Sequence, residues 1–405
     1  MNPIKKAWYR TFQCVFSAAQ TAIPQRSPAL LRGAGAVKEL PAFILSKGIH
    51  KVLLVTGKTT PKLGLTDSLF EAAKRDGLAV VPFHGAVVDP PFDCIEEAVR
   101  AYTDNHCEGI IAFGGGSAMD AAKAAAARIA RPHKTLGQLG GTLKVRKRIP
   151  PFFAVPTTAG TGSEATVAAV VKDPVTHRKF AIQDPSLLPK YAVLDPELTV
   201  ALPPSTTAAT GMDALTHAVE AYTNLFAPRY TRQLAEEAVA LIFRYLKRAY
   251  ADGKDLEARE QMLYASFLAG RAFSRACVGN VHAIAHTVGG LYGTPHGLAN
   301  AVILPFVLEA YGSRVKAKLA RLADLAGVDG SGCDEKARRF IEKIRSLNQE
   351  MGIEGPFDFI RDEDIPQMIR WAMKEANPLY PVPVIFDEPL MRQVIERVRT
   401  AGNSL

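Results

Sequence analysis

The feature that most constrains the fold of this chain is a regular alternation of short apolar runs and helical stretches between about residues 36 and 195. It predicts a buried strand at 51–57 (KVLLVTG), a helix at 67–77, strands at 78–83 and 109–113, a helix after Gly116 and a strand at 152–158. Strands that alternate with helices in this order favour a parallel sheet covered by helices. We therefore predict an α/β domain over residues 26–203, completed by a hairpin-like pair of strands within 166–183.

The pattern changes at Pro203 and Pro204, after which helical periodicity continues to the C-terminus with few strand signals. This change predicts an all-α domain over residues 204–405. Residues 1–25 follow neither pattern, because a basic patch there precedes a mildly apolar, helix-compatible segment. The segment favours an extra helix packed on the body over a helix that touches a membrane, and we leave it unassigned.

Composition excludes several classes of protein. The net charge is +9, but six of the positive charges precede the first acidic residue, Glu39, and no basic stripe is interleaved with aromatic residues, so we expect no nucleic-acid partner. No apolar run approaches the roughly 20 residues that a membrane-spanning helix needs. The five cysteines are scattered without a CxxC pair, which favours a reducing, cytoplasmic compartment.

Three consecutive glycines follow the predicted strand at 109–113. Gly114, Gly115 and Gly116 allow a tight turn and a close approach of ligand to backbone. The helix that follows directs its N-terminal N–H groups at this loop, which suits a pyrophosphate, with Ser117 as N-cap or phosphate donor. The loop is not a GxGxxG fingerprint, because Met119 occupies the last glycine position, and the alternative is a plain βα turn.

A second polar loop, PTTAGTGSEAT at 156–166, follows another predicted strand. It contains four threonines, which are Thr157, Thr158, Thr161 and Thr166. Two such loops at the carboxyl ends of strands in one parallel sheet predict a nucleotide site. The strand at 51–57 ends in Gly57 and Lys58, with no carboxylate there to bind a ribose, so we predict NADP in preference to NAD. The alternative is a turn glycine beside a solvated lysine.

Metal-ligand residue types cluster in the C-terminal half. Asp213 and His217 are four residues apart, as are His282 and His286, so on helices each pair shares a face. His296 follows a YGTP turn. One carboxylate with two or three imidazoles predicts a divalent-metal site, either Fe(II) or Zn(II), although a single histidine is more often a packing residue.

Four stretches together resemble the iron-containing (group III) alcohol dehydrogenase family. They are GGGSAMDAAK at 114–123, PTTAGTGSEAT at 156–166, LPPSTTAATGMDALTHAVEAY at 202–222 and HAIAHTVGGLYGTPHG at 282–297. The resemblance extends over residues 30–405 and leaves out residues 1–25. It implies a dehydroquinate-synthase-like fold, in which an α/β nucleotide domain and a helical domain bring one metal and a nicotinamide together.

The resemblance also implies roles for individual residues. The metal ligands would be Asp213, His217, His282 and His296, and His286 would lie beside the nicotinamide. Since an imidazole titrates near neutral pH, we predict that His286 is a proton relay, and the alternative is that it only shapes the pocket. Gly115, Gly116 and Ser117 would hold the pyrophosphate. The residues that would line or close the cofactor groove are Thr157, Thr158, Thr161, Thr166, Lys179 and Leu198. Gly57 departs from members that use NAD and have an aspartate there.

The expected function is therefore metal-dependent hydride transfer between a small alcohol or aldehyde and a nicotinamide cofactor. A lyase like dehydroquinate synthase and a non-catalytic nucleotide or metal sensor are the alternatives. The resemblance further implies a homodimer or larger homo-oligomer, and no partner other than the small substrate is expected.

Overall fold

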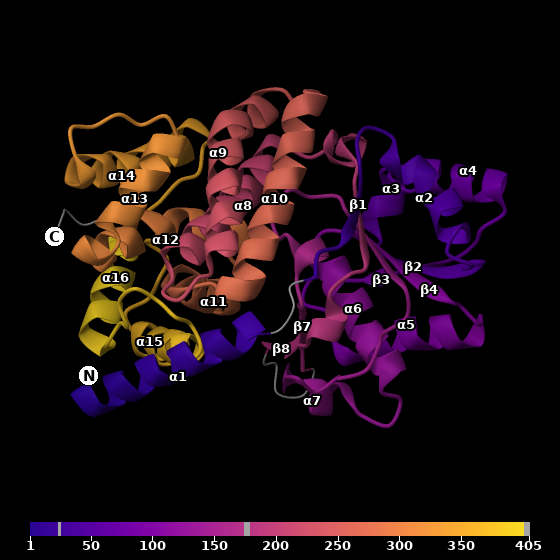
Figure 1. The fold of residues 1–405 in the computed structure, drawn as a ribbon, viewed down its shortest axis with the longest axis horizontal. Helices are drawn as coiled ribbons and strands as arrows, with labels where there is room; N and C mark the ends of the chain where they lie inside the picture. The colour runs from indigo at the N-terminus through magenta and orange to yellow at the C-terminus, as the bar shows by residue number, and fades with distance from the viewer. Residues whose placement is uncertain (23–25, 174–178, 401–405) are drawn as a thin grey trace. The chain divides into compact units, whose positions relative to one another are not determined.

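A computed structural model describes residues 1–22, 26–173 and 179–400 of the chain (Figure 1). The chain forms two compact units, one of residues 26–201 and 254–267 and the other of residues 1–25, 202–253 and 268–405. The main boundary, at Ala201 and Leu202, lies two residues before the predicted one at 203. Two segments are grouped differently from the prediction, since residues 1–25 belong with the helical unit and residues 254–267 with the α/β unit.

Among the described residues of the α/β unit, six parallel strands form a sheet in the order β1-β9-β6-β4-β2-β3. Their bounds are β1 Ala29–Arg32, β2 Lys51–Gly57, β3 Ala79–Ala86, β4 Gly109–Gly114, β6 Phe152–Pro156 and β9 Tyr191–Leu194. The helices of this unit are α2 Ala36–Leu45, α3 Thr59–Lys62, α4 Asp67–Asp76, α5 Phe92–Asp104, α6 Gly116–Ala130 and α7 Leu136–Leu139. The predicted parallel α/β architecture is confirmed.

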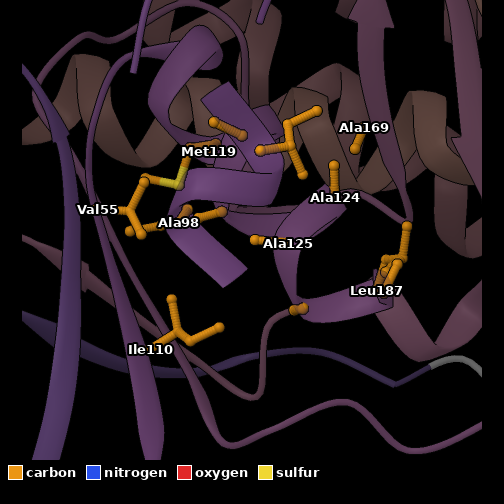
Figure 2. Close-up of a cluster of buried hydrophobic side chains, with 14 of the residues drawn as sticks. Val55, Ala98, Ile110, Met119, Ala124, Ala125, Ala169 and Leu187 are labelled. Atoms are coloured by element: carbon orange, nitrogen blue, oxygen red, sulfur yellow. The ribbon is translucent and has the colours of Figure 1, made fainter. Parts of the chain in front are cut away.

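Strands β4 and β6 are buried along their whole length, as expected for a parallel sheet covered on both faces. Figure 2 shows the cluster on one face, where Val55 and Ile110 of the sheet pack with Met119, Ala124 and Ala125 of α6. The alanine-rich sequence of α6 lets this helix approach its neighbours closely, because it presents few large side chains. The N-terminus of α6 is thereby fixed beside the carboxyl end of β4.

A second, three-stranded sheet is formed within the same unit by described residues in the order β5-β8-β7. Its strands are β5 Gly141–Thr142, β7 Ala168–Lys172 and β8 Lys179–Gln183, and β7 pairs antiparallel with β8. The predicted hairpin-like pair is therefore present. Short 3-10 turns connect the remaining segments at η1 Ser163–Ala165, η2 Pro185–Leu187 and η3 Pro196–Thr199.

The other unit is helical. Its elements are α1 Pro3–Ala22, α8 Pro204–Thr223, α9 Arg229–Ala251, α11 Asn280–Tyr292, α12 His296–Tyr311, η4 Gly312–Arg314, α13 Lys316–Leu325, α14 Cys333–Glu350, α15 Ile365–Ala376 and α16 Glu388–Thr400. Helix α10, Leu256–Ala276, begins in the α/β unit and ends in this one. Helix α8 packs against α9 and α12 and is buried on nearly all sides (Figure 1). Within the described ranges, no helix is both long and apolar enough to cross a membrane.

Candidate active site

Four ligand-type side chains converge in the helical unit, and we call them the cage. They are Asp213 and His217 of α8, His282 of α11 and His296 of α12. The Nε2 atoms of His217, His282 and His296 lie 4.0, 3.8 and 3.5 Å from Oδ1 of Asp213. Two ligand atoms bound tetrahedrally to one zinc or iron ion at about 2.1 Å are about 3.4 Å apart. The three distances to Asp213 are close to this separation, so the spacing of the cage residues suits one metal ion.

Backbone packing brings the cage together. Helix α12 begins at His296, and the next residue, Gly297, lies directly against α8. A Cβ atom at position 297 would be only 2.2 Å from the carbonyl oxygen of Ala209. Only glycine permits this approach without moving one helix, and the approach places His296 beside Asp213.

Burial distinguishes the members of the cage. Asp213, His217 and His282 are buried, whereas the His296 side chain is 41% exposed. The ring of His217 stacks between Phe273 and His282, with centroid distances of 4.2 and 4.5 Å. Burial, together with the neighbouring imidazoles, holds the pKa of His282 well below its usual value, so this ring is neutral and able to ligate. Three of the four cage residues are thus shielded from solvent and the fourth is accessible, which suits a catalytic metal site with one open position.

Glu220 orients one ligand of the cage. Its carboxylate lies 2.6 Å from Nδ1 of His282 and accepts hydrogen bonds of 2.8 Å from the N–H groups of Gly279 and Val281. Burial raises the pKa of Glu220 to about 8, and these hydrogen bonds oppose that shift. When the Nδ1 hydrogen faces Glu220, the Nε2 lone pair of His282 points into the cage, which is the usual outer-sphere arrangement of a metal-bound histidine.

Asn300 supplies a further polar group to the cage. Its Nδ2 atom lies 2.7 Å from Asp213 Oδ1 and 3.1 Å from Nε2 of both His282 and His296. The residue is fully buried, and its Oδ1 atom accepts no hydrogen bond from any residue that the structure describes. Because Nδ2 can only donate, Asp213 Oδ1 and the two Nε2 atoms all direct lone pairs toward one point, as the ligands of a cation do. The cage residues thus fit a divalent metal.

His286 lies next to the cage. Its ring stacks on that of His296 with a centroid distance of 5.1 Å, and its Nδ1 atom is 2.7 Å from Glu375 Oε1. The hydroxyl of Tyr380 donates to the same carboxylate oxygen over 3.0 Å. Burial, and then the charge of Glu375, raise the pKa of Tyr380 well above its usual value, so the hydroxyl keeps its hydrogen. Glu375 therefore fixes the orientation of the His286 ring.

The glycine loop and the threonine loop lie side by side in the α/β unit. Strand β4 pairs with β6, and Gly114 is in register with Pro156, so the two loops begin together. The chain runs from β2 outward to β3 and then returns to β4 on the other side of β2. A nucleotide is expected at the carboxyl end of such a reversal in strand order.

Gly116 is needed for the close approach of the threonine loop, whereas a Cβ atom on Gly115 would make only an ordinary van der Waals contact with it. A Cβ atom on Gly115 would lie 3.4 Å from Thr158 Oγ1, and one on Gly116 would lie 3.1 Å from Thr161 Cγ2. Gly114 has a φ of +149° and would place a Cβ atom 2.8 Å from that of Ala118. The bare backbone and the hydroxyls therefore face the N-terminus of α6, as a diphosphate group requires.

Ser117 does not cap this helix, because Gly115 occupies the N-cap position and α6 starts at Gly116. The N-cap alternative for Ser117 is therefore wrong. Its place in the first turn of α6 is compatible with the phosphate-donor alternative, which stays a prediction.

Lys123 is fully buried beneath the two loops. Its ammonium donates to the carbonyl oxygens of Ser163 at 2.6 Å, Thr166 at 2.9 Å and Ala168 at 3.1 Å, and lies 2.8 Å from Thr166 Oγ1. Burial lowers the pKa of Lys123 to about 8, while the charges of Asp120 and Glu164 oppose this shift. The lysine thus fastens α6 to the end of the threonine loop. Thr166 is one of its partners, so the hydroxyl of Thr166 faces Lys123.

The other predicted cofactor residues have different surroundings. Lys179 at the start of β8 pairs with Asp89 at 2.7 Å, and Leu198 is buried in the hydrophobic cluster between α2 and the sheet. Neither of these contacts involves the glycine loop. Gly57 ends β2, beside the reversal in strand order, and Lys58 follows it on the surface. Thr157 donates its N–H to the Gly114 carbonyl over 3.1 Å.

Four contributors to the two sites were missed from sequence. Glu220 lies three residues after His217, and Asn300 four residues after His296, so helical spacing from a ligand was a usable signal for both. Lys123 lies three residues after Asp120 in an alanine-rich, buried helix, where a charged side chain is too costly to be accidental. Glu375 has no such local signal, because it meets His286 only through packing of α11 on α15.

Comparison with known proteins identifies relatives over nearly the whole chain. A model of iron-containing alcohol dehydrogenases matches residues 27–196, and a model of the C-terminal part of the Fe-containing alcohol dehydrogenase family matches residues 207–398. Alcohol dehydrogenase 4 of Schizosaccharomyces pombe is 38% identical, over 87% of this chain and 84% of its own length. The NAD-dependent methanol dehydrogenase of Bacillus methanolicus is 36% identical, over 86% and 92%. A crystal structure of 1,3-propanediol oxidoreductase superposes with a TM-score of 0.89 at 35% identity, covering 93% of this chain and 99% of that one.

Proposed function

This chain belongs to the iron-containing alcohol dehydrogenase family, and we propose that it interconverts a small alcohol and its aldehyde through the cage and a nicotinamide cofactor. The observation that supports this proposal most is the convergence of one carboxylate and three imidazoles within 4.8 Å of one another. The named relatives act on simple alcohols and a diol, which agrees with this substrate class. They favour neither the lyase nor the sensor alternative.

A divalent metal in the cage would act as a Lewis acid on the substrate oxygen, and the nicotinamide would donate or accept the hydride. Iron(II) is the ion we propose, with zinc(II) as the alternative, because the donor set contains oxygen and nitrogen but no thiolate. Asp213 supplies the negative charge of the cage. Glu220 keeps the Nε2 lone pair of His282 directed into it, and His296 leaves it accessible from solvent.

His286 is proposed as the proton carrier for the alcohol. Glu375 accepts from Nδ1 of His286, which leaves Nε2 as the atom that takes or returns a proton. His286→Ala should lower turnover by about 10²-fold or more while the protein keeps its metal. His133→Ala, which removes an exposed histidine of the α/β unit, is the matched control and should change neither quantity. If metal content falls with turnover in His286→Ala, His286 belongs among the ligands instead.

NADP is proposed as the preferred cofactor because β2 ends in Gly57 and Lys58 without a carboxylate. The relative named as NAD-dependent points to the opposite preference. Lys58→Ala should lower the ratio of kcat/KM for NADPH over NADH. Gly57→Asp is a poorer test, because a Cβ atom there would lie 3.2 Å from the Ala86 carbonyl oxygen. A wild-type ratio below one would refute the preference.

The test of the function as a whole combines two measurements on anaerobically purified protein. Elemental analysis should find about one iron or zinc per chain. Oxidation of NADH and NADPH with a panel of small aldehydes should depend on that metal. Protein that binds nucleotide but reduces none of the aldehydes after metal is restored would support the sensor alternative.

A further inference from the structure

Helix α1 lies outside both family matches, which begin at residues 27 and 207. It is held on the helical unit by polar side chains. Arg10 donates to the carbonyl oxygens of Val382 and Pro383 at 2.6 and 3.0 Å, and the buried Gln13 donates to that of Tyr380 at 2.7 Å. The polar face of α1 is therefore turned toward the protein.

The opposite face of α1 is apolar and turned outward. Ile4, Trp8, Phe12 and Val15 are 79%, 56%, 37% and 64% exposed, and their spacing of four, four and three residues places them in one stripe. Trp8 contacts Phe12 with a centroid distance of 6.0 Å. A surface helix of a globular protein normally has the reverse arrangement, with its apolar stripe toward the core. The orientation of α1 thus leaves large apolar side chains in solvent.

The charge of α1 indicates what covers this stripe. The helix contains Lys5, Lys6 and Arg10 and no acidic residue, and the first carboxylate side chain of the protein is Glu39. Arg10 is engaged with the body, but Lys5 and Lys6 are exposed. Helical spacing places Lys5 at the flank of the stripe, whereas Lys6 lies on the same side of the helix as Gln13. Exposed aromatic and aliphatic residues beside lysines are typical of helices that lie in the interface of an anionic membrane. Pairing two copies of α1 would instead bring two cationic, acid-free helices together.

We propose that α1 docks this protein on the surface of a bilayer containing anionic lipids. The helix axis lies in the plane of the membrane, with the stripe of Ile4, Trp8, Phe12 and Val15 among the lipid chains. Lys5, which flanks the stripe, meets the lipid phosphates. Arg10 and Gln13 keep their hydrogen bonds to the helical unit, so docking requires no unfolding of α1.

The first test uses the two tryptophans of the chain, Trp8 and Trp371. Trp371→Phe leaves Trp8 as the only indole, and Trp8→Phe is the matched control that leaves only Trp371. With vesicles of phosphatidylcholine and phosphatidylglycerol, the emission of Trp8 should shift to shorter wavelength and that of Trp371 should not. Pure phosphatidylcholine vesicles should produce a smaller shift, and equal shifts with both vesicles would overturn the role of Lys5.

Vesicle co-sedimentation gives the second test. Trp8→Glu should weaken binding to anionic vesicles by more than about tenfold, while Leu256→Glu, at an exposed leucine of the other unit, should leave it unchanged. Lys5→Gln should weaken binding by about fivefold and Lys6→Gln should have a smaller effect, and added salt should weaken binding by the wild type. Absence of binding by the folded wild type would overturn the proposal. So would a dimer, measured by light scattering, that Trp8→Glu dissociates.

Discussion

In the helical unit the cage is built from side chains that enter it from three helices, whereas the loops after β4 and β6 present mainly backbone N–H groups and hydroxyls. The cage depends on which atoms are present at Asp213, His217, His282 and His296. The glycine loop depends on which atoms are absent, because a Cβ atom on Gly116 would press on Thr161. A side-chain site should therefore fail when one group is removed. A backbone site should fail when its support moves.

Loss of a cage ligand should have the largest effect. His282→Ala removes a ligand atom and also leaves the buried Glu220 without its imidazole partner. We expect metal affinity to fall by more than about 100-fold, which exceeds the usual effect of outer-sphere changes, and turnover to fall with it. Nucleotide binding to the α/β unit, measured by fluorescence titration, should be retained. Full metal occupancy in the variant after dialysis against a metal buffer would contradict the assignment of the cage.

A smaller loss is expected when the support of the cage is changed and its ligands are kept. Glu220→Gln puts an amide where the Gly279 and Val281 N–H groups and His282 all approach a carboxylate. Metal affinity should drop by about 10- to 100-fold, measured by competition with a chelator. Glu236→Gln is the control, because Glu236 pairs with Tyr222 and Arg321 away from the cage. Equal affinities for the two variants would mean that Glu220 does not orient His282.

Part of the cage was predictable from helical spacing, which pairs Asp213 with His217 on one helix and His282 with His286 on another. The spacing left open which of the histidines bind the metal, and the set of four ligands that includes His296 came from the family resemblance. The β–α alternation predicted the sheet for a similar reason, since each strand is marked by its own apolar run. The local pattern did not show which helices and strands contact one another.

The missing information concerned contacts between residues far apart in the chain. Glu375 and His286 are 89 residues apart, and Lys123 reaches carbonyls more than 40 residues away. From sequence we place residues 254–267 in the helical domain because they follow a long helix of that domain. In the structure they belong with the α/β unit. Glu260 in this segment pairs with Arg32 of the α/β unit at 2.7 Å. Contacts of this kind place residues 254–267 in the α/β unit, and the periodicity of the local sequence does not show them.

The support of the nucleotide loops should respond less than the cage. Lys123→Met keeps an unbranched side chain but removes the ammonium that binds the carbonyl oxygens of Ser163, Thr166 and Ala168. We expect the KM for the nicotinamide nucleotide to rise about tenfold, because one set of charge-assisted hydrogen bonds is worth about 1.5–3 kcal/mol. Metal content should not change. Lys74→Met, at an exposed lysine of α4, should leave both quantities at wild-type values, and an unchanged KM in Lys123→Met would remove the lysine from this role.

The last prediction concerns stability and not activity, and it involves Glu164, the buried acid of the threonine loop. Burial raises the pKa of Glu164 from 4.5 to about 7, so the folded protein binds its proton more tightly than the unfolded chain. The free energy of unfolding should therefore decrease as pH rises from about 4.5 to about 7, by an amount on the order of 3 kcal/mol for this group. Glu164→Gln removes that titration. In chemical denaturation, the free energy of unfolding of Glu164→Gln relative to that of the wild type should be higher at about pH 7.5 than at about pH 4.5. If the difference between the two proteins is the same at both pH values, Glu164 ionises normally in the folded protein.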